Sequence, residues 1–268
     1  MLQQAGDFRE ESETLFALLD PLGDQEWEQK TQFKGWTLND VVAHVHLGNY
    51  AADLSLRDSA AFVAFMQSLT SARTHKDGHL GFTHAWLRGT QGRALVQQWR
   101  AFYLEMAERF ALADPKMRVK WAGPDMSVRS SITARLMETW AHGQAVYDVL
   151  GYVRRDTDRL KNIAVLGINT FGWTFANRGV RVPAEVPAVR LTAPSGAVWV
   201  WGPPEAENFI EGSAVEFCQV VTQVRNVADT ALRVVGATAT QWMAIAQCFA
   251  GPPEDPPAPG SRFRQVRA

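Results

Sequence analysis

Hydrophobic side chains recur every three or four residues through the first two thirds of the chain, with polar residues between them. This spacing is typical of helices that bury one face. It predicts helices over residues 7–19, 37–52, 60–69, 92–113, 127–151 and 157–176. In the helix expected over 127–151, the positions that could face a core are Val128, Ile132, Leu136, Trp140 and Tyr147. Such a series predicts an antiparallel helical bundle.

The helix expected from residue 37 carries a strong start signal. Thr37 is a good N-cap residue, and Asp40 stands where its carboxylate can return a hydrogen bond to the cap. Trp36, a large aromatic residue beside the cap, is expected to pack against the bundle.

The pattern changes after Pro183, where apolar residues begin to alternate with a period of two. The segments 189–192 and 198–201 flank a Pro-Ser-Gly turn and are typical of a β-hairpin. Further strands and helices are expected over 208–212, 213–223, 231–236 and 240–249, with Ser213 as a helix cap.

The chain is therefore predicted to be an α+β protein with two domains. A helical bundle is expected over residues 1–182 and a small α+β domain over 185–251. Residues 252–268 form a Pro-rich tail that is expected to be extended or disordered.

Composition narrows the class of protein. The 268 residues are 46% hydrophobic and 21% charged with a net charge of −1, which favours neither a nucleic acid nor a membrane as partner. No apolar run is long enough to cross a bilayer, and the acidic, polar N-terminus does not resemble a signal peptide. A cytoplasmic protein is expected, with Cys218 and Cys248 as buried thiols.

Glu138 and His142 stand four residues apart in the helix expected over 127–151, so they project from the same face. A carboxylate and an imidazole in this arrangement can hold one side of a metal ion, but a catalytic zinc usually takes three protein ligands. His44 and His46 point about 160° apart on their helix, so at most one of them can face the pair. The position of His44, one turn beyond Asp40, favours His44 as the third ligand.

The segment between the helices expected over 60–69 and 92–113 contains His75, His79 and His84 among Gly, Lys and Asp residues. Three histidines could form a metal site, but their spacing matches no recognised ligand pattern. The interpretation favoured from the sequence is a solvated surface loop.

The sequences GWTLNDVVAH (35–44) and ETWAHG (138–143) together resemble the mycothiol-dependent maleylpyruvate isomerase family. The resemblance continues through residues 121–151 and 189–236, so it covers most of the chain. It is strongest to a subfamily described only as metal-binding. It implies a DinB-like helical bundle at the N-terminus and a small sterol-carrier-like α+β domain after it.

The resemblance implies a divalent metal, normally zinc, held by His44, Glu138 and His142, and a low-molecular-weight thiol as cosubstrate. In the family, the thiolate adds to an activated double bond of the substrate, the bond rotates, and the thiolate leaves. The family also implies a basic residue from the C-terminal domain, and the nearest match is Arg225, which could bind a substrate carboxylate. The segment from His75 to Arg88 departs from the family pattern. Trp121, Met126 and Trp140 suggest an aromatic pocket wall, which would suit a flatter substrate.

Several alternatives stay open at this level. Arg135, one turn before Glu138, could orient that carboxylate or could be an ordinary surface residue. The open metal position could hold water instead of a thiol, giving a hydrolase or lyase. A third hypothesis is a binding protein for small molecules without enzymatic activity. A small-molecule substrate and a monomer or homodimer are expected.

Overall fold

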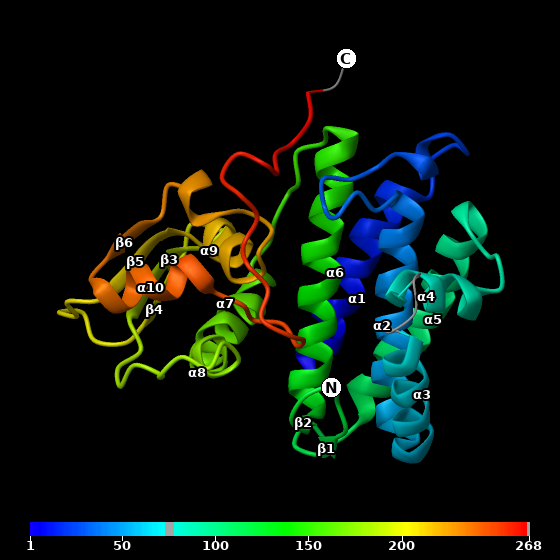
Figure 1. Ribbon diagram of the computed structural model, residues 1–268, viewed down its shortest axis with the longest axis horizontal. Helices are drawn as coiled ribbons and strands as arrows, with labels where there is room; N and C mark the ends of the chain where they lie inside the picture. Colours follow the sequence, from blue (N-terminus) through cyan, green and yellow to red (C-terminus); the bar gives the residue numbers. More distant parts are fainter. Residues whose placement is uncertain (73–77, 267–268) are drawn as a thin grey trace. The chain divides into compact units, whose positions relative to one another are not determined.

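Long amphipathic helices build the first of two units, Met1–Val149, in a computed structural model that describes residues 1–72 and 78–266 (Figure 1). The helices are α1 (Gln3–Leu19), η1 (Glu26–Glu28), α2 (Leu38–Arg57), α3 (Ser59–Ala72), α4 (Gly78–Leu87), α5 (Gly92–Leu112) and α6 (Val128–Leu150). α1 packs on α5, and α5 packs on α2. The predicted bundle and the two-domain α+β class are confirmed.

The core of this unit is rich in large aromatic side chains. The fully buried ones include Phe8, Trp99, Tyr103, Phe110 and Trp140. Burial of a side chain of this size contributes roughly 1.5–3 kcal/mol or more, so the bundle has a substantial hydrophobic core. The apolar face predicted for α6 is confirmed, because all five of its residues are buried.

The predicted cap of α2 forms. Thr37 Oγ1 accepts a hydrogen bond from the Asp40 amide at 3.1 Å, and Asp40 Oδ2 accepts one from the Thr37 amide at 2.9 Å. These reciprocal bonds make a capping box at the start of α2. Ser127 Oγ accepts a bond from the Ser130 amide at 3.1 Å at the start of α6. The N-terminal turns of the two helices that carry the candidate ligands are therefore fixed.

The surface loop predicted between α3 and α5 is wrong for residues 78–87, which form α4. This helix packs on α2 and α3, with Thr83 and Leu87 buried. The sequence hid it because Gly78 and Gly81 are poor helix formers and its apolar pattern is weak. His75 lies outside the described residues. Residues 118–127 make a two-stranded hairpin of β1 (Arg118–Val119) and β2 (Met126–Ser127).

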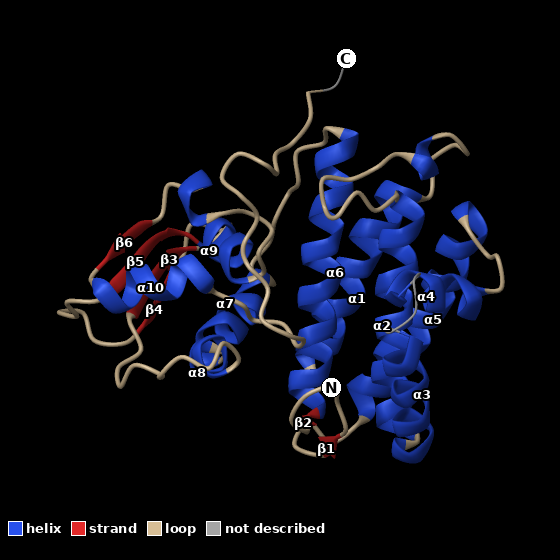
Figure 2. Ribbon diagram, in the orientation of Figure 1, coloured by secondary structure: helices blue, strands red, loops and turns tan. Residues whose placement is uncertain are grey.

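The second unit, Leu150–Ala268, is a small α+β structure (Figure 2). Its elements are α7 (Leu160–Asn169), α8 (Phe171–Ala176), β3 (Ala188–Thr192), β4 (Val198–Trp201), β5 (Phe209–Ser213), α9 (Ala214–Val221), η2 (Val227–Asp229), β6 (Arg233–Val235) and α10 (Ala237–Ile245). The sheet has the order β4-β3-β5-β6, in which β3 and β5 are parallel and the other pairs antiparallel. The predicted hairpin of β3 and β4 is confirmed, as is Ser213 as the cap of α9.

The division between the units lies earlier in the chain than the boundary expected at 182–185. α7 packs on α9, and α8 packs on α10, so both helices cluster with the sheet. A methyl group on Gly167 would come within 2.8 Å of Val221, which shows how closely α7 and α9 approach. The single helix predicted over 157–176 is interrupted at Thr170, whose hydroxyl donates to the carbonyl of Leu166 at 2.8 Å.

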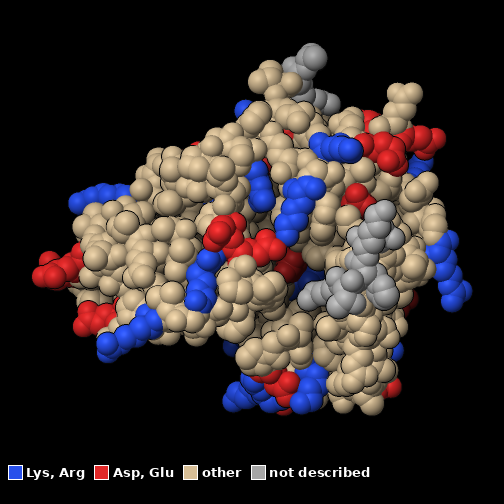
Figure 3. Space-filling model, in the orientation of Figure 1, with Lys and Arg blue, Asp and Glu red and all other residues tan. Residues whose placement is uncertain are grey.

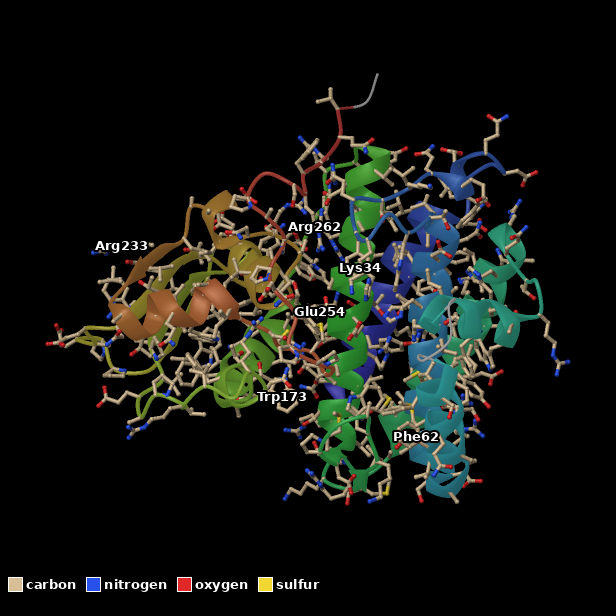
Figure 4. The ribbon with its side chains drawn as sticks, in the orientation of Figure 1. Lys34, Phe62, Trp173, Arg233, Glu254 and Arg262 are labelled. Atoms are coloured by element: carbon tan, nitrogen blue, oxygen red, sulfur yellow. The ribbon has the colours of Figure 1, made fainter. Side chains whose placement is uncertain are left out.

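The described part of the Pro-rich tail, 252–266, is neither helix nor strand, and it is hydrogen-bonded to the rest of the second unit. Gln223 Nε2 donates to the carbonyl of Glu254 at 2.8 Å, and Arg262 donates to the carbonyl of Gln223 at 2.7 Å (Figure 4). Asn226 Nδ2 donates to the carbonyl of Pro257 at 2.8 Å. Prolines have no amide hydrogen, so a Pro-rich segment has few backbone donors to pair with its own carbonyls. Side chains elsewhere in the second unit donate to these carbonyls instead.

The charged surface residues and the two cysteines are as the composition led us to expect. Lys and Arg side chains are interspersed with Asp and Glu side chains on the face shown in Figure 3. Within residues 1–72 and 78–266, the helices are all too short or too polar to span a bilayer. Cys218 and Cys248 are free and buried, as predicted.

Candidate metal centre

Three side chains from two helices converge at the candidate site. His44 lies two turns into α2, and Glu138 and His142 lie one turn apart on α6. Glu138 Oε2 stands 3.1 Å from His142 Nε2 and 3.7 Å from His44 Nε2. The structure therefore brings together the three residues that the resemblance implies as metal ligands.

The donor set is a group that could hold a metal ion. Ligand atoms about 2.0–2.2 Å from a tetrahedral zinc lie roughly 3.4 Å from one another. The three donor atoms here all lie within 4.8 Å of one another. Two imidazoles and one carboxylate are a typical catalytic set that leaves a position open. The side chains are 12–23% exposed, so a small molecule could reach that position.

The electrostatics of the site keep the carboxylate charged and one imidazole neutral. Burial acts to raise the pKa of Glu138, but the neighbouring rings of His142 and His44 and the charge of Arg135 outweigh it and hold that pKa well below its usual range. Burial, with the neighbouring His142, lowers the pKa of His44 to about 3. A charged carboxylate and a neutral imidazole are the protonation states that bind metals.

Arg135 is buried between α6 and α2. Its Nε donates to Asn49 Oδ1 at 3.0 Å, and its guanidinium also reaches the carbonyl of Val45 at 3.4 Å. The interpretation as a surface arginine is wrong, because the residue is only 3% exposed. The guanidinium occupies space that Gly48 leaves free, since a Cβ there would lie 2.6 Å from it. Its positive charge helps to keep Glu138 ionised.

Two histidines of α4 contact the same face of α2. His79 Nε2 lies 3.0 Å from His44 Nδ1, on the side of that ring away from Glu138. His84 Nε2 lies 2.7 Å from Asp40 Oδ1. The metal site considered for the three histidines 75, 79 and 84 is not formed by the two that the structure describes, because they contact different residues of α2. His79 instead joins the site of His44.

An aromatic wall, which we define as Phe33 and Trp36, borders the imidazoles. The Trp36 ring stacks on His142 with an interplanar angle of 10° and a centroid separation of 6.2 Å. The Phe33 ring makes an edge contact with His142 at 5.0 Å. Trp36 thus packs on the bundle as predicted, and it does so at the candidate site.

The aromatic residues expected to line the pocket lie elsewhere. Trp140 is buried in the core, and Trp121 stacks on Phe62 of α3. His46 is 2% exposed and contacts the rings of Trp86 and Phe102. Burial lowers the pKa of His46 to about 4, so it is a neutral core residue.

Arg225 belongs to the second unit, just after α9. Its guanidinium donates to the carbonyl of Val224 at 3.1 Å, and the residue is partly exposed. A guanidinium carries five donors in a planar fork whose geometry matches a carboxylate.

Sequence reasoning missed His79 and Phe33 as parts of the site. Neither carries a local signal, because each reaches the ligands through the packing of a different segment against α2 and α6. The sequence does contain one local signal for this wall. Trp36 directly precedes the cap residue Thr37, so it lies beside the N-terminus of α2.

Comparison with known proteins identifies relatives that match most of this chain. Residues 8–147 match the family model described as the mycothiol maleylpyruvate isomerase N-terminal domain. Uncharacterised proteins from two strains of Mycobacterium tuberculosis, CDC 1551 / Oshkosh and ATCC 25618 / H37Rv, are each 37% identical over 247 residues. These alignments cover 92% of this chain and 95% of each relative.

Solved structures share the fold at lower identity. The crystal structure of a mycothiol-dependent maleylpyruvate isomerase is similar with a TM-score of 0.54 and 15% identity, over 87% of this chain and 91% of that one. The structure of a histidine-to-alanine mutant of a mycothiol-dependent maleylpyruvate isomerase is similar with a TM-score of 0.51 and 16% identity, over 81% and 87% of the two chains.

Proposed function

The chain belongs to the family of the mycothiol maleylpyruvate isomerase N-terminal domain, and on that premise we propose that it is a metal-dependent enzyme that uses a low-molecular-weight thiol. The reaction proposed is the isomerisation of a small, electrophilic, anionic substrate, or transfer of the thiol to it. The observation that carries this proposal is the convergence of His44, Glu138 and His142.

Each residue of the site would have its own role. His44, Glu138 and His142 would hold a divalent metal, and we propose zinc, because two imidazoles and a carboxylate suit it. A metal there would act as a Lewis acid and favour the thiolate form of a thiol in its open position. Glu138 would offset part of the positive charge, and Phe33 and Trp36 would limit the access of water to one side of the site.

Arg225 is proposed to bind the substrate's carboxylate. Its guanidinium can make two parallel hydrogen bonds to a carboxylate, which fixes orientation as well as affinity. Arg135 is proposed as a positioning residue, because its buried charge favours the ionised state of Glu138.

Metal analysis of the full chain tests the centre. We expect one zinc per chain after loading and dialysis, and zinc affinity weaker by more than about 100-fold in Glu138→Gln, since loss of an outer partner alone costs roughly 10- to 100-fold. Glu105→Gln is the matched control, because Glu105 is an exposed residue of α5 that pairs with Arg109. Equal zinc binding by the wild type and Glu138→Gln contradicts the proposal.

Thiol titration tests the chemistry. We expect mycothiol to bind the zinc-loaded protein and not Glu138→Gln, and to be required for isomerisation of maleylpyruvate or a related unsaturated dicarboxylate. Hydrolytic turnover that needs zinc and is indifferent to thiol would replace the proposed reaction with metal-activated water chemistry.

A further inference from the structure

The ring of His44 is held on both sides. Its Nε2 faces Glu138 at 3.7 Å, and its Nδ1 lies 3.0 Å from Nε2 of His79. The two imidazole rings meet at 65°, with centroids 5.1 Å apart. Each nitrogen of His44 therefore has its own polar neighbour, one on α6 and one on α4.

The direction of the bond between the two rings decides what the other nitrogen of His44 can do. If His79 Nε2 accepts, His44 carries its proton on Nδ1 and presents a lone pair at Nε2. If His79 Nε2 donates, a neutral His44 carries its proton on Nε2 and has no lone pair there for a metal. Only the first direction is compatible with His44 as a ligand through Nε2.

α4 packs on α2 and α3 through its buried residues Thr83 and Leu87, and this packing holds His79 close to His44. One turn after His79, the buried hydroxyl of Thr83 donates to the carbonyl of His79 at 2.8 Å. Further along α4, His84 bonds to Asp40, which itself belongs to the capping box of α2. Of the two side-chain contacts with α2, only the one at His79 reaches a candidate ligand.

We propose that His79 is a positioning residue for the metal centre: it accepts the Nδ1 proton of His44 and so keeps Nε2 of His44 free to bind the metal. This rests on the proposed function, because it takes His44 as a ligand. In many metal sites a carboxylate, a carbonyl or water plays this part. Here a second imidazole does so, supplied by a helix that the sequence pattern conceals.

The test is the zinc affinity of the full chain, measured by competition with a chromogenic chelator. His79→Phe keeps a planar ring but removes the acceptor, and we expect zinc to bind about 10- to 100-fold more weakly. His79→Gln offers an amide oxygen as acceptor and should stay within about threefold of the wild type. His84→Phe is the matched control, since it removes the other imidazole of α4 and should leave zinc affinity unchanged.

The outcomes separate this inference from the function on which it rests. Zinc affinity of His79→Phe equal to that of the wild type overturns the role of His79 and leaves the metal centre standing. Failure of the wild type to bind zinc overturns the centre and the role of His79 together. A similar loss of affinity in His84→Phe overturns the role too, because it would show that docking of α4 alone matters.

A second measurement covers the case in which His79→Phe does not fold. Nitrogen chemical shifts of the His44 imidazole in the zinc-loaded wild type report which ring nitrogen carries the proton. We expect a protonated Nδ1 coupled to His79. A proton on Nε2 of His44, or zinc bound through Nδ1, overturns the inference.

Discussion

At the scale of single residues, charge and burial decide which side chains can act. Glu138 stays ionised inside the bundle because imidazoles and Arg135 surround it. Cys218 is more deeply buried, and its neighbours are Cys248 and the carboxylate of Asp156, so burial and these groups raise the pKa of its thiol. The first environment suits a metal ligand, and the second makes an inert thiol.

The raised pKa of Cys218 predicts slow alkylation. In the unfolded chain the thiol of Cys218 ionises near pH 8.5, whereas in the folded chain it stays protonated at higher pH. The free energy of unfolding therefore falls as the pH rises above about 8.5. At about pH 9, iodoacetamide should modify Cys218 at least roughly 100-fold more slowly in the native protein than in urea, because only thiolate reacts. Mass spectrometry of the modified peptide gives both rates. Similar rates in the two conditions would show that Cys218 is accessible and ionised.

Arg225 gives a second prediction at this scale. Arg225→Ala should raise KM for a dicarboxylate substrate by about 10- to 100-fold, since a charge-assisted pair contributes about 1.5–3 kcal/mol. Arg233→Ala is the control, because Arg233 lies on β6, where it pairs with Glu211 and stacks on Phe209 (Figure 4). Steady-state kinetics with maleylpyruvate measures the change. Equal KM values for the two variants would remove Arg225 from the site.

At the scale of elements, the contact between α2 and α6 depends on a glycine, which has no side chain. The absence of a side chain at Gly48 lets the guanidinium of Arg135 lie against α2. Without that space, Arg135 could not reach Asn49 and Val45 while staying near Glu138. The spacing of the two ligand-bearing helices and the charge beside the ligands are therefore linked.

Substitution of Gly48 tests that link. Gly48→Ala gains up to about 1 kcal/mol in helix propensity, but moving the buried guanidinium costs roughly 1–3 kcal/mol, so we expect a net loss of about 1 kcal/mol. Gly6→Ala in α1 is the matched control, because a Cβ there meets nothing within 4 Å, and it should stabilise the protein by about 0.5–1 kcal/mol. Urea unfolding measures both. A stabilised Gly48→Ala would contradict the account.

Which elements the sequence predicts depends on whether their signals are local. The capping box of Thr37 and Asp40 and the apolar face of α6 lie within a few residues, so the pattern alone locates α2 and α6. α4 is different, because what it contributes, the bonds of His79 and His84, depends on its docking against α2. The break at Thr170 likewise follows from how α7 and α8 pack on α9 and α10.

The same distinction applies to the candidate site. Glu138 and His142 are four residues apart, so helix geometry alone predicts that they share a face. His44 was favoured by its place after the cap, and the structure brings it to that face. Phe33 and His79 could not be found in this way, since each joins the site only through tertiary contacts.

At the scale of the whole molecule, the three donors lie in the first unit, and Arg225 lies in the second. Each unit has its own core, the first around Trp99 and Trp140 and the second around Phe217 and Trp242. The metal would therefore require only the first unit.

This division predicts how zinc changes thermal unfolding. Calorimetry should resolve two transitions, and zinc at about 100 times its Kd should stabilise the unit with the donors by roughly 3 kcal/mol, or about 6–10 °C. In Glu138→Gln, zinc should shift neither transition. A zinc-dependent shift that survives in Glu138→Gln would place the metal elsewhere.

The separation of the donors along the chain also determines when a nascent polypeptide could first capture a metal. His44 leaves the ribosome early, but Glu138 and His142 follow only after α3, α4 and α5 have been translated. Before that point an emerging chain offers His44 without its partners, so it has no complete donor set to compete for zinc with other cellular ligands. Metal loading would therefore come after α6 has been translated and has packed against α2, and it would report that the bundle has assembled correctly.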